Sequence, residues 1–468
     1  DRSTVEHLYS NLVFNFSDMP KTKKLTDREM LYIIVATDSG ITNGCGYIIP
    51  DNLFKLQDKD FCSDCPNETC VMLDDLNKLW GGSIMALQKN RIKDGITIVG
   101  AGTTGYLTTL YLCKNYPELK ITWIYPEDNK PIGVGEATVP DVTHFLHDLG
   151  IDAKIILNKL NGSLKLGIRF EDFYEKGTVI YHPFGVSEEE SFDLKYCMEH
   201  KIVPDDILDY EEIATHFDVR ELMLYLDEVM KDLPNLTIDR RYVNSVEEIQ
   251  EDFIVDCTGF SRSLYDYKFK SIADKVPNNR ALVYRGQYTD KQKQKVPYTN
   301  CVGADYGWIW ETPLNETIAF GYVHDDTYDV KDEFVKHLEK HFDTVDESLI
   351  RSVPMITGRN TEHMVQIGSK TVVAIGLSSF FIEPLESTGL YLVAYGVKTL
   401  NSYLQGEFTM EEYNTVYNKE FDVILDFIVA HYKFSKRDNE YWNRYKDIDI
   451  ELYKENNIFP KRSWDYLL

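Results

Sequence analysis

The chain has 468 residues, of which 43% are hydrophobic and 27% charged, as is typical of a folded globular protein. Its 50 basic and 76 acidic residues leave a net charge of −26, so nucleic acid and anionic membranes are poor partners. No run of roughly 18 apolar residues predicts a membrane span, and residues 1–20 lack the basic start and apolar core of a signal peptide. We therefore expect a cytoplasmic protein.

Residues 1–94 differ from the rest of the chain and are expected to be an N-terminal extension of unknown role. They hold one plausible strand at 31–36, turn-rich stretches and an expected helix near 74–88. This part of the chain also contains four cysteines: Cys45, Cys62, Cys65 and Cys70. Their spacing permits a structural zinc site with four thiolate ligands but is not diagnostic of one. Reduced cysteines that bind no metal explain the same pattern equally simply.

From residue 95 onward, short apolar strands alternate with helical stretches. This alternation predicts a parallel sheet with helices packed on it. The expected strands are 96–99, 121–125, 253–259 and 371–376, an amphipathic helix is expected over 219–233, and the last 80 or so residues look helical.

A glycine-rich turn lies directly between the first of these strands and its helix. The motif Gly100-x-Gly102-x-x-Gly105, with Thr103 and Thr104, is typical of dinucleotide binding. Glycine permits the tight turn and the approach of backbone N–H groups to a pyrophosphate, which the helix N-terminus also attracts.

The acid that usually holds the ribose should end the second strand, but Tyr125 stands there. One of the two acids just beyond it, Glu127 or Asp128, is the candidate substitute. FAD is favoured over NAD by two distant strand–turns, 255–260 and 374–381. The second of these contains Gly376 and Leu377, which we expect near the flavin chain.

The segment 162–173 alternates like a strand with one wet face. Leu164 and Ile168 point one way, whereas Lys165 and Arg169 point the other. On these residues alone, the simpler interpretation of Lys165 is a solvated side chain.

Several motifs, in one order, resemble the flavin-dependent tryptophan halogenases over roughly residues 95–445. The run 132–140 (IGVGEATVP) resembles their flavin strap. The run 307–314 (GWIWETPL) resembles their W-x-W-x-I-P motif, with Thr312 in place of isoleucine. The other counterparts are 165–173 (KLGIRFEDF), 181–185 (YHPFG), 381–389 (FIEPLESTG) and 426–442. The short chain and its acidic net charge resemble those of virus-encoded members of this family.

This resemblance implies an α/β fold. It would have an FAD-binding Rossmann-type core of the flavin monooxygenase type over 95–405, with an inserted β-sheet substrate region, and a helical C-terminal substrate-side part over 406–468. It also implies that reduced FAD (FADH2) from a separate reductase and O2 oxidise chloride, bromide or iodide to hypohalous acid. That oxidant then halogenates an aromatic small molecule, and a homo-oligomer is expected.

The resemblance assigns roles to individual residues. Lys165 would guide the halogen and Glu386 would accept the ring proton as catalytic residues, because electrophilic substitution passes through a cation. The remaining assignments are flavin binding by Gly135, Glu136 and Ala137, halide binding by Thr388 and Gly389, substrate contacts by Ser387, Tyr441 and Trp442, and crowding of the flavin side by Trp308 and Trp310.

Simpler explanations stay open for several of these residues. Ser387 would cap a helix in any protein, and paired tryptophans are common in cores. A flavin monooxygenase or a catalytically silent FAD-binding interaction protein are the alternative functions. Because the C-terminal part is shorter than is usual in the family, we expect a broad range of electron-rich arenes as substrates.

Overall fold

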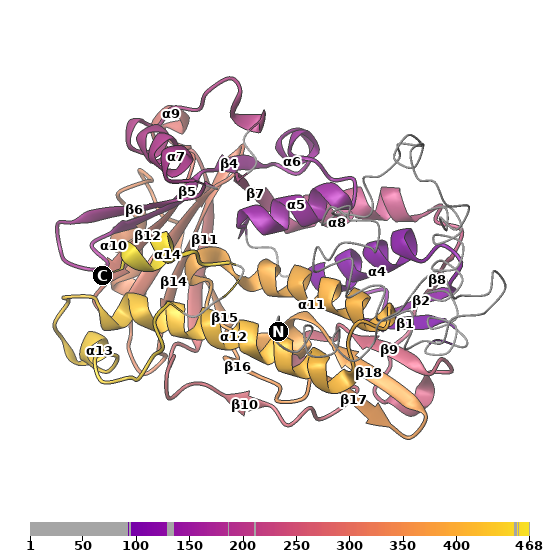
Figure 1. Cartoon of the computed structure of the whole chain (residues 1–468). Coiled ribbons are helices and arrows are strands. Elements are labelled where there is room, and N and C mark those ends of the chain that lie inside the picture. Colours follow the sequence, from indigo (N-terminus) through magenta and orange to yellow (C-terminus); the bar gives the residue numbers. More distant parts are fainter. Residues whose placement is uncertain are drawn as a thin grey trace, which may run out of the picture. The chain divides into compact units, whose positions relative to one another are not determined.

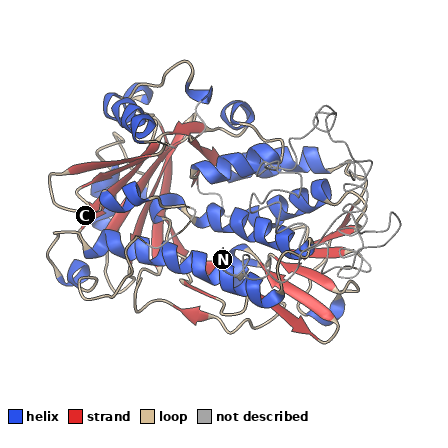
Figure 2. Cartoon of the chain, in the orientation of Figure 1, coloured by secondary structure: helices blue, strands red, loops and turns tan. Residues whose placement is uncertain are grey.

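The alternating strands and helices assemble into a six-stranded sheet, as the sequence predicts (Figures 1 and 2). The computed structural model describes residues 92, 95–128, 135–185, 187–209, 212–453, 456 and 458–467. In spatial order the strands are β17 (Met364–Ile367), β18 (Lys370–Ala374), β9 (Phe253–Asp256), β1 (Ile96–Val99), β2 (Ile121–Ile124) and β8 (Leu236–Asp239). Only the β17–β18 pair among these neighbours is antiparallel. The Rossmann-type α/β core is confirmed.

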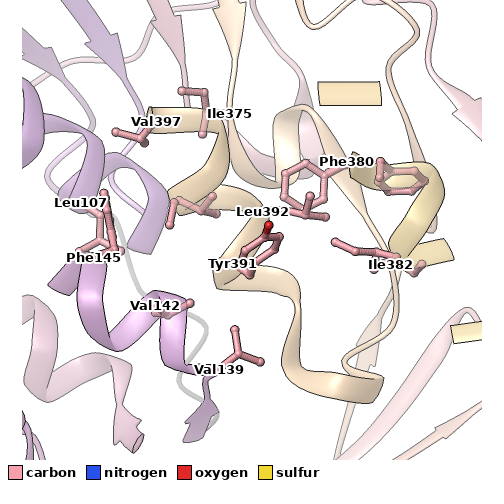
Figure 3. Close-up of a cluster of buried hydrophobic side chains, with 14 of the residues drawn as sticks. Leu107, Val139, Val142, Phe145, Ile375, Phe380, Ile382, Tyr391, Leu392 and Val397 are labelled. Atoms are coloured by element: carbon pink, nitrogen blue, oxygen red, sulfur yellow. The ribbon is translucent and has the colours of Figure 1, made fainter. Parts of the chain in front are cut away.

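Helices pack against this sheet and against one another. They are α4 (Thr103–Asn115), α5 (Pro140–Asp148), α8 (Val219–Met230), α11 (Gly389–Leu404) and α12 (Met410–Lys433). Figure 3 shows Leu107 of α4, Phe145 of α5 and Leu392 of α11 in one buried cluster. Burying each such side chain contributes about 1.5–3 kcal/mol, so this cluster holds the helices in place.

A second sheet, of seven strands, lies at the left of the view, whereas the first lies at the right (Figure 2). Its order is β15 (Arg351–Pro354), β11 (Arg280–Gln287), β14 (Thr317–His324), β13 (Gly307–Pro313), β12 (Thr299–Ala304), β5 (Gly167–Glu171) and β6 (Val179–Pro183). Helix α10 (Lys331–Leu338) buries Phe334 and Leu338 against side chains of β11, β13 and β14. This sheet is the β-sheet insertion that the resemblance implies.

Smaller elements complete the described ranges. Two three-stranded sheets have the orders β3 (Gly135–Ala137), β7 (Ala214–Asp218), β4 (Ser163–Lys165) and β10 (Lys270–Ser271), β16 (Gly358–Arg359), β19 (Phe380–Phe381). The remaining α-helices are α6 (Ala153–Lys159), α7 (Glu188–His200), α9 (Lys291–Gln294), α13 (Glu440–Asn443) and α14 (Lys461–Asp465).

The segment 162–173 is not one strand with a wet face. It leaves the small sheet after Lys165 and joins the seven-stranded sheet at Gly167, pairing first with β7 and then with β12. At the switch, the Leu166 N–H donates to Pro297 O at 2.8 Å. Lys165 therefore lies in the interior, with none of its surface exposed, and the solvated interpretation of this residue is wrong.

The expectations for the strand at 31–36, the helix at 74–88 and the four-cysteine zinc site fall outside the described residues. Within the described ranges, the structure contains no helix with the length and apolar character that crossing a membrane requires.

Candidate active site

The glycine fingerprint forms a turn that only glycine allows at two positions. Gly100 has φ of +108°, and a Cβ there would lie 2.2 Å from Cys257 O. A Cβ on Gly105 would lie 2.0 Å from Gly100 O. Gly102 is different, because it is exposed and a Cβ there would meet no atom within 4 Å. The absence of a side chain on Gly102 therefore leaves room on the solvent side of the turn and not within the protein core.

The start of α4 suits a phosphate. No side chain caps this helix, and its first turn, which includes Thr103 and Thr104, holds no acidic residue. Uncapped N–H groups at a helix start attract anions. Gly376, with φ of +72°, also approaches this turn, since a Cβ on it would lie 2.2 Å from Thr104 Oγ1. The strand–turn with Gly376 and Leu377 thus lies against the fingerprint, which fits an extended dinucleotide such as FAD.

The end of β2 offers two candidate acids for the ribose. Tyr125 follows the strand and is buried, with the Arg240 guanidinium 4.1 Å from its ring centre. Asp128 accepts a hydrogen bond of 2.7 Å from the Tyr242 hydroxyl. Glu127 is exposed, so its role as ribose ligand stays a prediction.

The expected flavin strap is described from Gly135 onward, because residues 132–134 lie outside the described ranges. Gly135, Glu136 and Ala137 form β3, which pairs with β7. Burial raises the pKa of Glu136 to about 7. Thr138 follows directly, and its carbonyl contacts Lys165.

Lys165 is enclosed by neutral groups. Its Nζ donates to Thr138 O at 2.7 Å and to Ser387 Oγ at 2.8 Å, and it lies 5.5 Å from the centre of the Phe184 ring. Burial lowers the pKa of this amine to about 7, although the charge of Glu386 opposes the shift. Near neutral pH the side chain is therefore divided between ammonium and free amine.

Glu386 is held between two imidazoles. Its carboxylate lies 3.1 Å from His182 Nδ1, and its Oε1 lies 2.9 Å from His431 Nε2 without the alignment of a hydrogen bond. Burial would raise the pKa of Glu386, yet the two imidazoles hold it well below its ordinary value. Glu386 is thus a buried carboxylate at neutral pH.

Further partners fix both imidazoles. His182 Nε2 lies 2.9 Å from Ser463 Oγ of α14, and His431 Nδ1 lies 2.5 Å from the Tyr174 hydroxyl. None of these four residues has a role that its sequence position alone predicts. His182 and His431 lay inside motifs already singled out, YHPFG and 426–442, and a buried histidine in a catalytic motif was the available signal.

The backbone at the carboxylate is strained. Glu386 has φ of +65° and Ser387 has φ of +57°, so two consecutive residues with side chains adopt the left-handed region. Each costs about 1–2 kcal/mol. This turn directs Ser387 Oγ toward Lys165 and away from the helix start, so Ser387 does not act as the cap that was its simpler interpretation.

Helix α11 consequently begins without a side-chain cap. Thr388 is buried and its Oγ1 has no partner among the described residues, whereas Gly389 is exposed and a Cβ there would meet nothing within 4 Å. Unpaired donors at a helix start attract a small anion. This geometry suits the predicted halide site at Thr388 and Gly389.

A second carboxylate, that of Glu383, links the tryptophan motif (307–314) to the motif that contains Glu386 (381–389). Trp308 Nε1 donates to Glu383 Oε1 at 3.0 Å, and Asn278 Nδ2 donates to Glu383 Oε2 at 2.7 Å. Trp310 lies flat over Gly321, where a Cβ would come 1.9 Å from the indole. Both tryptophans therefore have structural contacts, and their crowding of a flavin stays a prediction.

Tyr441 and Trp442 are fully buried. The Tyr441 hydroxyl donates to Asn278 Oδ1 at 2.9 Å, and Trp442 Nε1 donates to Ala304 O at 3.0 Å. Their polar atoms are satisfied inside the protein, so neither presents a free donor to a ligand. Their place in the substrate wall stays a prediction.

Comparison with known proteins places these features in a family. A family model described as Tryptophan halogenase matches residues 95–216 and 213–463. Over 420 residues the chain is 27% identical to the 7-chloro-L-tryptophan 6-halogenase KtzR of Kutzneria sp. (strain 744), covering 74% of this chain and 81% of the relative. It is also 27% identical to the tryptophan 7-halogenase RebH of Lentzea aerocolonigenes, covering 76% and 79%.

Solved structures agree. The apo structure of VirX1 is similar with a TM-score of 0.66 and 26% identity, covering 75% of this chain and 79% of that chain. BrvH, a flavin-dependent halogenase from Brevundimonas sp. BAL3, has a TM-score of 0.66 at 22% identity, covering 81% and 89%, which shows the shared fold.

Replacing Gly102 by alanine separates cofactor binding from folding. We expect Gly102→Ala to weaken FAD binding by roughly tenfold or more, about 1.4 kcal/mol, because the new methyl occupies the pyrophosphate side of the turn. Its stability should change by less than about 1 kcal/mol, since the methyl meets no protein atom. Flavin fluorescence and denaturant unfolding measure the two effects. Undiminished FAD affinity would show that FAD does not bind at this glycine turn.

The buried amine predicts a pH-dependent stability. Between its folded pKa near 7 and its ordinary value of 10.5, Lys165 is protonated in the unfolded chain and neutral in the folded one, so stability rises with pH. From pH 7 to 9, wild type should gain about 2 kcal/mol more than Lys165→Met. Urea unfolding of both proteins at each pH measures this difference. Parallel pH profiles would show that the amine is not perturbed.

Proposed function

Because this chain belongs to the tryptophan halogenase family, we propose how its own residues carry out flavin-dependent halogenation. A halide is held at the start of α11, Lys165 directs the resulting hypohalous acid, and Glu386 takes up the ring proton. Reduced FAD bound at the fingerprint supplies, with O2, the oxidising power that converts halide into hypohalous acid. A separate reductase provides the reduced flavin.

One observation carries this proposal: three successive residues join the three functions. Glu386 is the buried base, Ser387 accepts the hydrogen bond from Lys165 Nζ, and Thr388 directly precedes the uncapped helix α11. Any shift of this turn moves the base, the lysine contact and the anion donors together. The strained backbone of residues 386–387 is consistent with such a functional constraint.

The half-protonated lysine suits its role. As an ammonium, Lys165 donates a hydrogen bond to the oxygen of hypohalous acid and makes the halogen more electrophilic. The arene attacks the halogen, the oxygen–halogen bond breaks, and hydroxide leaves as water with the proton from Nζ. In the net reaction, the arene and hypohalous acid give a haloarene and water.

Glu386 completes the substitution. Its negative charge stabilises the cationic ring, and the carboxylate then accepts the proton from the substituted carbon. His182 and His431 do not react in this scheme. They are positioning residues that keep the carboxylate ionised and oriented, as its lowered pKa indicates.

We propose an aromatic small molecule of broad identity as the substrate. Tyr441 and Trp442 are fully buried and keep their polar atoms within the protein, so these predicted wall residues would back an apolar wall and supply no charge to an amino acid. Such a wall selects electron-rich rings by shape and apolar contact.

Product analysis tests the proposal. Wild type, supplied with regenerated FADH2, O2 and each halide in turn, should halogenate several members of a panel of phenols, indoles and free tryptophan, as read by mass spectrometry. Lys165→Met should halogenate none while binding FAD normally and still releasing hypohalous acid to an amine trap in solution. Hydroxylated products without halogen would indicate a monooxygenase instead.

Glu386→Gln supplies the second comparison. It keeps the shape of the side chain but removes the charge and the proton acceptor, so arene halogenation should fall about 100- to 10,000-fold. Single-turnover rates with FAD binding as the control measure this loss. A rate equal to that of wild type would remove Glu386 from the mechanism.

A further inference from the structure

A cluster of two histidines and one glutamate lies outside the proposed active site. Glu311 on β13 extends its Oε1 to 2.8 Å from His337 Nε2 and 3.0 Å from His341 Nε2. One ligand atom from each of the three residues lies within 4.8 Å of the others. The mechanism above uses none of them.

The local fold brings these atoms together. His337 is on α10, and His341 lies in the turn that follows the end of this helix at Leu338. The Nε2 atoms of both imidazoles reach Glu311 on β13. Hydrogen bonds of 2.8 Å from Thr289 Oγ1 and from Gln294 Nε2 hold the His341 carbonyl in place. The two nitrogens therefore converge on one carboxylate oxygen from a fixed backbone.

The other carboxylate oxygen is held separately. Asn300 Nδ2 donates to Glu311 Oε2 at 3.0 Å, and Asn300 Oδ1 accepts from Arg169 at 2.9 Å. Outer partners of this kind orient ligating carboxylates in metal sites.

We propose that Glu311, His337 and His341 bind a divalent transition-metal ion such as Zn²⁺. Two imidazole nitrogens and one carboxylate oxygen are a known zinc donor set that leaves the fourth position to water. Tetrahedral ligands of zinc stand about 3.3 Å apart. The two nitrogen–oxygen distances of 2.8 and 3.0 Å therefore need to open by a few tenths of an ångström for the ion to enter, and the two nitrogens lie within 4.8 Å of each other.

Access and charge also suit a cation. The His341 side chain is 21% exposed, whereas those of His337 and Glu311 are 8% and 12% exposed, so the ion enters past His341. A chain with a net charge of −26 attracts cations. Once bound, the ion would fasten the end of α10 to the strand that carries Trp308 and Trp310.

The experiment uses the full chain, freed of metal by chelation, loaded with Zn²⁺ and passed over a desalting column. Bound zinc is counted by mass spectrometry in a Cys45→Ser, Cys62→Ser, Cys65→Ser, Cys70→Ser background, which removes all four thiolate candidates. One equivalent should remain in this background. It should be lost on adding His341→Gln but kept on adding His200→Gln, an exposed histidine outside the cluster.

Two further readouts keep the test independent of folding defects. Asn300→Ala leaves all three ligands and should weaken zinc binding about 10- to 100-fold. Co²⁺ in the serine background should give the visible absorption of a low-coordinate nitrogen–oxygen site, without thiolate charge transfer. No bound zinc in the serine background, or equal zinc in the His341→Gln and His200→Gln proteins, would overturn the proposal.

Discussion

The whole site depends on burying one lysine. Lys165 is removed from water where β4 gives way to β5, and only a backbone carbonyl and a serine hydroxyl receive its hydrogen bonds. An ammonium in such surroundings loses much of its hydration, which explains why its pKa falls to about 7. The charge of Glu386 limits the fall. The amine is therefore poised between two protonation states at the pH where enzymes work.

The carboxylate is stabilised by a different means. His182 comes from β6 and His431 from α12, so the ionised state of Glu386 depends on elements that are distant in the sequence. The same turn then continues into the uncapped start of α11. Base, lysine contact and anion donors thus share one short backbone segment, and its strain is offset by the packing of α11 and α12 around it.

Sequence reasoning succeeded where the signal was local. The strand, glycine turn and helix over residues 96–115 formed as expected, because the spacing of Gly100 and Gly105 encodes a backbone geometry. It failed for the surroundings of Lys165, because burial arises when the chain changes sheets at Leu166, which alternation of side chains does not reveal. The imidazoles around Glu386 were missed because tertiary contacts, not spacing, bring them together.

The proposed role of Lys165 depends on its ionisation, which NMR can observe directly. In protein carrying ¹³C-labelled lysine, the ε-carbon signal that disappears in Lys165→Met belongs to this residue, and its shift is followed as pH rises. A buried, neutral-lined amine should titrate with a midpoint near 7, well apart from the other lysines. A midpoint near the ordinary value of 10.5 would mean a solvated ammonium and would exclude the proposed role of Lys165.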